Sequence, residues 1–454
     1  MGNLMTALLN SGNAMQAYNQ ALNVTENNTL NASTPGYAAQ TATFVAMPFD
    51  PSVGLPGGVM SGPVQSSRDA FAEQAVQQQS AALGASQQQA TDLNNIQQLF
   101  SLSSTNGPSA SMDTLFQSFS ALSINPNDPV ARQTVLNDAQ QVAQAFNTVG
   151  NGLANASATE TQMAASTISS INSLAAQIAQ LNGQRQQNNT GAPDAGTDAN
   201  LHADLEQLSQ YAGFTALQQP DGSVSVFLGG QTPIVMGNQS LPIQGDFSLP
   251  QMRVLNAQGN DITSQISSGQ LSAEVNVQNN LIPSYMAKVN TLAQGLADQV
   301  NTTLSQGVDQ NGNAPVNNLF TYDAANGAAQ TFAVNPLMTT DQIAAALPQA
   351  PGGNGNALNL AALASAPLVG GYTFDQYFGA LGGQVGGDVA NATANQTNDQ
   401  QLLTQAQSLR SQVSGVSLDT EATKLIQYQR SYQAVAKMVT VLDDLTNTLL
   451  GIIP

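Results

Sequence analysis

The two ends of this 454-residue chain carry the same seven-residue pattern of apolar side chains. Near the N-terminus, steps of four and three residues connect Leu4, Leu8, Ser11, Met15, Tyr18, Leu22 and Thr25. Near the C-terminus, the same steps connect Leu425, Tyr428, Tyr432, Val435, Val439, Leu442, Thr446 and Leu449. This spacing is typical of coiled-coil helices, and an isolated amphipathic helix is marginal in water. We therefore expect the two ends to pack on each other and then on neighbouring subunits; the alternative is an antiparallel pair that closes a monomer.

The middle of the chain predicts a helix that is too long for a compact sphere. Asp128-Pro129 is a helix start signal, because an acidic N-cap precedes a proline at the first helical position. No proline follows until Pro193, and apolar residues keep helical spacing as far as Leu181. We predict one helix of roughly 50 residues, which would span about 75 Å at ~1.5 Å per residue.

The remaining segments alternate between helical and extended patterns. Helices are predicted from about Asp69 to Leu102, Leu201 to Leu208, Tyr285 to Leu304 and Tyr372 to Arg410. Extended structure is predicted for residues 41–67 and, around the turn Pro220-Asp221-Gly222, for short strands between Phe214 and Met236. Residues 184–200 are interpreted as a polar linker and residues 307–370 as irregular.

These patterns predict a mainly α fold. Its parts are long coiled-coil-like helices formed by the paired N- and C-terminal segments, a helical-bundle middle and a small inserted β-rich domain. The expected divisions are a terminal coiled-coil assembly domain (1–50 plus 412–454), a helical rod domain (51–190 plus 270–306 plus 371–411), a β-rich outer domain (191–269) and an irregular segment of the rod or outer domain (307–370).

The composition excludes several classes of function. Only 8% of the residues are charged, where an ordinary domain carries roughly 25%, and the formal net charge is −19 with nine basic residues. Such a chain cannot neutralise a row of phosphates or adhere to an anionic membrane, so we expect no nucleic acid and no membrane among its partners. No apolar stretch approaches the ~18–20 residues of a membrane span. No Lys or Arg precedes Arg68, so a secretory signal peptide is not expected.

The residues that could carry chemistry do not form a set. There is no Cys, and the single His, His202, lies near Asp204 and Glu206, which gives two possible metal ligands on one helix face but no third. We interpret this segment as a solvated helix start. The stretch 309–313 resembles a calcium loop, but its glycine comes too early and no Glu closes it, so a turn is favoured. We predict no catalytic residue, no cofactor and no metal, and no enzyme activity.

The two ends also resemble a known family. The N-terminal motif is Asn27-Asn28-x-x-Asn31-Ala32-x-Thr34-Pro35-Gly36-Tyr37 followed by Gln40, and the C-terminal motif is Ser414-Gly415-Val416-Ser417-Leu418-Asp419-x-Glu421, then Leu425-Ile426-x-Tyr428-Gln429-x-x-Tyr432-Gln433-Ala434. Together they are similar to the terminal signatures of bacterial flagellar rod, hook and hook-associated proteins. Thr29 and Ala38-Ala39 depart from the usual pattern.

The interior resembles the hook-associated protein 1 family within that group. The stretches that carry this resemblance are Asn125-Pro126-x-Asp128-x-x-Ala131-Arg132-Gln133-x-Val135-Leu136, Ile171-Asn172-x-Leu174-Ala175-x-Gln177-Ile178-Ala179-x-Leu181-Asn182, Asp221-Gly222-Ser223-Val224-x-Val226, Phe332-Ala333-Val334-Asn335-Pro336 and Ile343-Ala344-Ala345-Ala346. The chain is short for this family, so an outer domain of longer relatives is expected to be reduced or absent.

The resemblance implies a structural subunit that joins hook to filament and polymerises through its terminal helices. It implies a homo-oligomer in a ring or tubular array, with the flagellar hook protein and hook-associated protein 3 as neighbours and an export chaperone at the C-terminal helix. The location would be the extracellular flagellum, reached by export without a cleaved signal peptide. Two alternatives remain: a hook or distal-rod subunit of the same family, or a surface enzyme or adhesin that uses the β-rich module.

The residues expected at the assembly interface are those of the two stripes and the N-terminal motif. They are Leu4, Leu8, Met15, Tyr18, Leu22, Asn27, Asn28, Asn31, Pro35, Gly36, Tyr37, Leu418, Leu425, Tyr428, Tyr432, Val435, Val439, Leu442 and Leu449.

Overall fold

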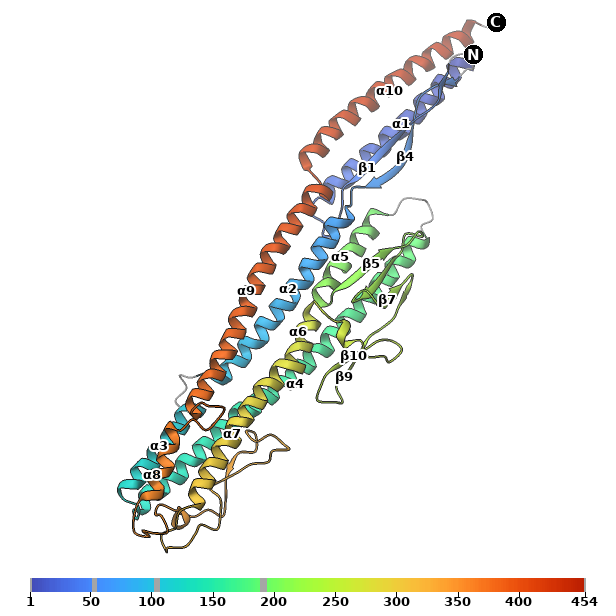
Figure 1. Ribbon diagram of the computed structural model, residues 1–454. Coiled ribbons are helices and arrows are strands. Elements are labelled where there is room, and N and C mark those ends of the chain that lie inside the picture. The colour runs from blue at the N-terminus through green and yellow to red at the C-terminus, as the bar shows by residue number, and fades with distance from the viewer. Residues whose placement is uncertain (1, 51–54, 102–106, 188–193, 453–454) are drawn as a thin grey trace.

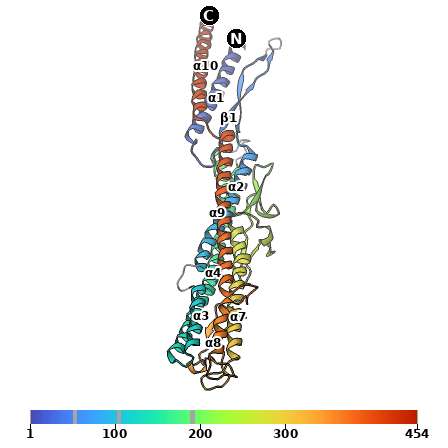
Figure 2. The ribbon, with the colours of Figure 1, turned by 60° about the vertical axis from the view of Figure 1, so that its left-hand side comes forward.

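The computed structural model describes residues 2–50, 55–101, 107–187 and 194–452. The molecule is a long rod of helices, and both chain ends lie at the same tip (Figure 1). Small sheets attach to the sides of this rod, which keeps its elongated outline when it is turned (Figure 2). The prediction of a mainly α fold with long helices and a small β-rich part is confirmed.

The upper part of the rod is built from the two ends of the chain. Helix α1 (Gly2–Leu30) runs from the tip toward the middle of the rod, and α10 (Leu418–Ile452) returns beside it to the tip (Figure 1). A β-hairpin packs along α1, as the extended pattern of residues 41–67 predicted. Its main strands are β1 (Gln40–Ala46) and β4 (Val59–Ser66), joined through β2 (Phe49–Asp50) and β3 (Leu55–Pro56).

The lower part is a bundle of long helices in which α2 (Ala70–Gln97) and α9 (Phe374–Ser414) lie side by side. The predicted central helix is present as α4 (Pro129–Gln187), whose 59 residues span about 90 Å. Helices α3 (Pro108–Ile124) and α7 (Ile282–Ser305) complete the base. Helix α4 passes through almost the whole length of the lower part (Figure 1). It is therefore the main structural element of that part.

Two separate apolar cores lie along α4. The first core fills the base. It includes α4 residues as far as Leu153, together with Val277 and the apolar stripe of α7. The second begins on α4 at Ala164 and includes Leu271. Of the α4 residues between Leu153 and Ala164, Ala156 packs against the first core, and the stretch 157–163 belongs to neither core.

The second core lies under a small antiparallel sheet. Its strands are β5 (Phe214–Gln218), β6 (Val224–Leu228), β7 (Thr232–Met236) and β8 (Gln239–Ser240), in that order. A second hairpin, β9 (Gln244–Asp246) with β10 (Arg253–Leu255), and helix α5 (Ala195–Tyr211) pack beside it. Helix α6 (Gln270–Asn276) and a π-helical turn, Val277–Leu281, then return the chain to α7.

Three features of the fold correct the sequence interpretation. Helix α3 was not predicted, although Met112, Leu115 and Phe119 are buried at helical spacing on it. Helix α5 begins within the predicted linker 184–200, because the Asp194 side chain caps it by accepting from the Thr197 amide at 2.8 Å. The segment 307–370 contains a helix, α8 (Gly355–Ala362), as well as the short hairpin of β11 (Phe320–Thr321) and β12 (Ala333–Val334).

One buried arginine fastens that segment to the rod. The Arg132 side chain on α4 is 2% exposed, and its guanidinium donates to the carbonyls of Pro126, Thr340 and Ile343 at 2.8–2.9 Å. Burial lowers the pKa of Arg132 from its usual value. Because buried carbonyls need donors, this one side chain determines where residues 340–343 lie.

Replacing this arginine should loosen the base of the rod. Arg132→Met keeps much of the volume but removes the hydrogen bonds to the carbonyls of Pro126, Thr340 and Ile343, so we expect the free energy of unfolding to fall by roughly 3 kcal/mol. The measurement is urea unfolding followed by circular dichroism. Arg430→Met, which changes an exposed arginine on α10, is the control and should leave the midpoint unchanged. Equal midpoints for the two variants would contradict the role given to Arg132.

Candidate assembly site at the paired chain ends

Helices α1 and α10 lie side by side along a seam, and the predicted apolar heptad residues on both of them are only half-buried. On α1 these side chains are Leu4, Leu8, Met15, Tyr18 and Leu22, and on α10 they are Leu425, Tyr428, Tyr432, Val435, Val439 and Leu442. Beyond Glu421, no α10 side chain from Ala422 to Thr448 is fully buried. The Leu449 side chain lies outside the described residues. A single chain therefore brings the stripes together without closing the seam.

Three aromatic rings fix the register in the middle of the seam. Tyr18 on α1 has its ring centroid 5.4 Å from Phe44 on β1 and 6.5 Å from Tyr428 on α10. The Phe44 and Tyr428 rings are 6.0 Å apart. Tilted aromatic pairs at these distances are favourable, so this triangle links both helices and the hairpin.

A buried asparagine joins the two ends below the aromatic triangle. The Asn28 side chain is fully buried; it donates to the Gln40 carbonyl at 2.8 Å and to a Glu421 carboxylate oxygen at 3.0 Å. Its oxygen accepts from the Gln40 amide at 2.8 Å and from the Tyr37 hydroxyl at 2.9 Å. Burial and the Glu421 carboxylate raise the pKa of Tyr37 to about 12, and Lys424 pairs with Glu421 at 2.8 Å.

The rest of the N-terminal motif forms the turn that follows α1. Asn31 donates to the Asn27 carbonyl at 2.9 Å and accepts from the Thr34 hydroxyl at 3.0 Å. Gly36 has a φ of +72°, and a β-carbon there would lie 2.2 Å from the Ala199 carbonyl oxygen on α5. Only glycine allows this approach, so the motif both reverses the chain and docks it on the lower rod.

A network of charged side chains holds that docking in place. Arg68 donates to the Gly36 carbonyl at 2.7 Å and pairs with Glu73 on α2 at 2.5 Å and Asp198 on α5 at 2.8 Å. On α9, Arg410 pairs with Glu206 at 2.7 Å and with Glu73 at 3.3 Å. These arginines connect the turn, α2, α5 and α9 at the junction of the two parts of the rod.

Sequence reasoning placed the heptad positions and Asn28 in the site but missed several partners. Ala17 and Ala21, which are not heptad positions, are fully buried on α1, and their small size was the only available signal. Thr25, a heptad position that was not expected at the interface, is also buried. Glu421 is 3% exposed and bonds to Asn28 across 393 residues, a pairing that no local pattern indicates. Three predicted interface residues, Asn27, Pro35 and Leu418, are exposed in the single chain.

The segment around His202 differs from the solvated helix start that was expected. The His202 ring is largely buried, 3.9 Å from Asp198, and burial together with the nearby Arg68 lowers its pKa to about 3. It is therefore a neutral part of the charged network. Within the described ranges, no group of three His, Cys, Asp or Glu side chains could hold a metal ion. The Asp309 side chain accepts from the Asn311 and Asn313 amides at 2.8 Å, which confirms the turn predicted there.

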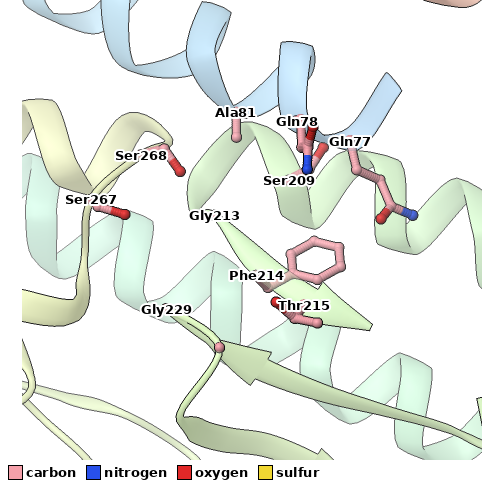
Figure 3. A pocket seen from close by; sticks show the side chains of 11 residues that line it. Gln77, Gln78, Ala81, Ser209, Gly213, Phe214, Thr215, Gly229, Ser267 and Ser268 are labelled. Carbon is pink, nitrogen blue, oxygen red and sulfur yellow. The ribbon is translucent and has the colours of Figure 1, made fainter. Parts of the chain in front are cut away.

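A cavity of about 360 Å³ lies between α2 and the edge strand β5 (Figure 3). Its lining consists of glutamine, serine, threonine, glycine, alanine and one phenylalanine, Phe214. Figure 3 places Gln77 and Gln78 on the α2 side and Thr215 on the strand side of this hollow. None of the residues that line this cavity is an acid or a base, so this cavity offers no acid–base pair.

The fold and the seam define an elongated, helical structural protein whose two chain ends pair with each other. A family model described as the flagellar hook-associated protein FlgK helical domain matches residues 93–320, which is half of the chain. The chain belongs to this flagellar hook-associated family. A second model, the flagellar basal body rod FlgEFG protein C-terminal region, matches residues 407–452, which include α10.

Individual relatives agree with this assignment. Flagellar hook-associated protein 1 of Bacillus subtilis is 25% identical over 96% of this chain and 96% of its own length. The protein of the same name from Escherichia coli is 26% identical over 68% of this chain, and the match spans 59% of the E. coli protein. The flagellar hook junction protein FlgK from Burkholderia pseudomallei, a solved structure with 15% identity, matches 75% of this chain and all of its own with a TM-score of 0.66, so it shares the fold.

The Asn28 hydrogen bonds lead to a test of the junction. Asn28→Ala removes four hydrogen bonds and leaves the buried Gln40 amide without an acceptor, so we expect the junction to lose roughly 3 kcal/mol of stability. Amide exchange of the peptide that contains Gln40 measures this loss. Asn19→Ala, at an exposed position on the same helix, is the matched control. If the Gln40 peptide is equally protected from amide exchange in both variants, Asn28 does not hold the two ends together.

Proposed function

We propose that this protein is a structural subunit of the bacterial flagellum that joins hook to filament and polymerises through its paired terminal helices. The names of its relatives, flagellar hook-associated protein 1 and flagellar hook junction protein, support this role. In this proposal, residues 1–50 plus 412–454 are the assembly domain, and the long rod and the β-rich part at 191–269 extend away from it. The protein is not an enzyme in this role.

The observation that carries the proposal is exposed apolar surface on α10 outside the heptad stripe. Ile426, Met438, Val441 and Leu445 are 48–58% exposed. On α1, Met5 and Leu9 are at least 60% exposed. Exposed apolar surface of this kind marks an interaction site, and copies of the same helices would bury it in a repeating array.

The partners follow from this position in the flagellum. We propose a homo-oligomeric ring or tubular array whose neighbours are the flagellar hook protein and hook-associated protein 3. Because α10 exposes its apolar face in the single chain, an export chaperone that covers this helix before assembly is part of the proposal. The proposal includes export to the flagellum without cleavage of a signal peptide. No helix in the described ranges is long and apolar enough to cross a membrane.

This exposed apolar surface of α10 can be tested directly. The double variant Val441→Ser and Leu445→Ser makes part of it polar and leaves every heptad position unchanged, so we expect a folded monomer that no longer enters the flagellum. Gln429→Ser with Gln433→Ser, at two exposed polar positions of the same helix, is the matched control. Incorporation is measured by complementing a strain that lacks the gene and detecting the protein in purified flagella. Normal incorporation of the Val441 and Leu445 variant would contradict the proposed interface.

The phenotype of the deletion strain separates the junction role from its alternatives. A junction subunit predicts that hooks remain and that unassembled flagellin is released into the medium. Loss of the hooks themselves would instead identify a hook or distal-rod subunit. Normal filaments, together with hydrolase activity of the purified protein, would favour an enzyme or adhesin.

A further inference from the structure

Three buried carboxyl groups occupy the gap between the two apolar cores. Asp92 on α2, Glu160 on α4 and Glu274 on α6 are 2%, 4% and 0% exposed. Glu160 lies in the stretch of α4 that belongs to neither core, and Glu274 lies between Leu271 of the second core and Val277 of the first. We name these three side chains the carboxyl layer. They form a polar layer between the two apolar cores.

The layer has fewer hydrogen-bond partners than its oxygens require. Asp92 accepts from Gln88 at 2.7 Å, and Glu274 accepts from Thr167 at 2.8 Å and Gln270 at 2.9 Å. One oxygen of each acid, Asp92 Oδ2, Glu160 Oε2 and Glu274 Oε2, is buried without a partner. Gln278, one turn beyond Glu274 in the π-helical turn, also has a buried side-chain oxygen without a partner.

No cation compensates these acids. The ion pairs of the described residues involve none of the three, and the charged groups that act on each member of the layer are the other members. The remaining neighbours from α2, α4 and α6 are the neutral side chains Gln88, Thr167 and Gln270. An unpaired charge at such a site is strongly unfavourable. The three acids must therefore be largely protonated when α2, α4 and α6 are packed together.

Protonation also supplies the missing hydrogen bonds. Asp92 and Glu160 lie within hydrogen-bonding reach of each other, and two carboxyl groups can share a bond only if one carries a proton. Burial raises the pKa of Asp92 and Glu160 well above the usual range, and their mutual proximity raises that of Glu160 further. Burial raises the pKa of Glu274 to about 7.

We propose that the carboxyl layer is a proton-dependent contact: it holds α2, α4 and α6 together when its acids are neutral, and it loosens when they ionise. The folded state keeps these protons at pH values where an unfolded chain, with carboxyl pKa values near 4, has released them. The contribution of the layer to stability is therefore complete below about pH 4 and is lost as the pH rises through about 7 to 8. This property belongs to the single chain and does not depend on the role in the flagellum.

Amide exchange of the full-length monomer at about pH 6 and about pH 8.5, corrected for the chemical pH dependence of exchange, tests the proposal. Peptides that cover 86–96, 156–168 and 270–282 should lose protection by about tenfold or more at the higher pH. Peptides of the first core at 285–300 should lose much less. Unchanged protection of the three peptides that cover the carboxyl layer would overturn the proposal.

Variants then assign the effect to the layer. Glu160→Gln keeps the shape of the side chain but cannot ionise, so it should reduce the pH-dependent loss of protection in all three peptides. Asp444→Asn, the same chemical change at an exposed position of α10, should leave the loss as in the unaltered protein. If Glu160→Gln does not fold, Glu274→Gln serves as the second variant. If a folded variant still shows the full pH-dependent loss of protection, the carboxyl layer is not the source of that loss and the proposal is refuted.

Discussion

The hydrogen bonds of Asn28 fix the point at which the two ends of the chain meet. They connect α1, the turn that follows it and Glu421 at the start of α10. From this point the direction of α10 is set, and the aromatic contacts of Tyr18, Phe44 and Tyr428 then align the two stripes. The arginine network below it, centred on Arg68, transmits that orientation to the lower rod.

The burial of side chains divides the rod into regions of different stability. The base has a large apolar core, and the second core under the β-sheet is separated from it by the carboxyl layer. The tip has no fully buried α10 side chain from Ala422 to Thr448 and carries an exposed apolar face as well. Since stability follows buried apolar contact, the part of the chain that we propose to join other copies is the part least able to stand alone.

Local sequence patterns were sufficient where local spacing decides the structure. The central helix follows from the absence of proline between Pro129 and Pro193, and the terminal stripes follow from their heptad spacing. The same patterns missed α8, which is short and lies among glycines, because tertiary contacts rather than propensity stabilise it. They could not indicate that Asp92, Glu160 and Glu274 meet, because these acids lie on three helices far apart in the chain. His202 was assigned to solvent for the same reason.

We propose that the α1–α10 seam closes only when other copies surround it. The sharpest test is to compare the amide exchange of residues 4–30 and 418–448 in dilute monomer and in assembled flagella. We expect protection in the monomer to be concentrated near Asn28 and Glu421 and to fall toward the tip, and assembly to protect both helices along their whole length. Full protection of both helices in the monomer, unchanged on assembly, would contradict it.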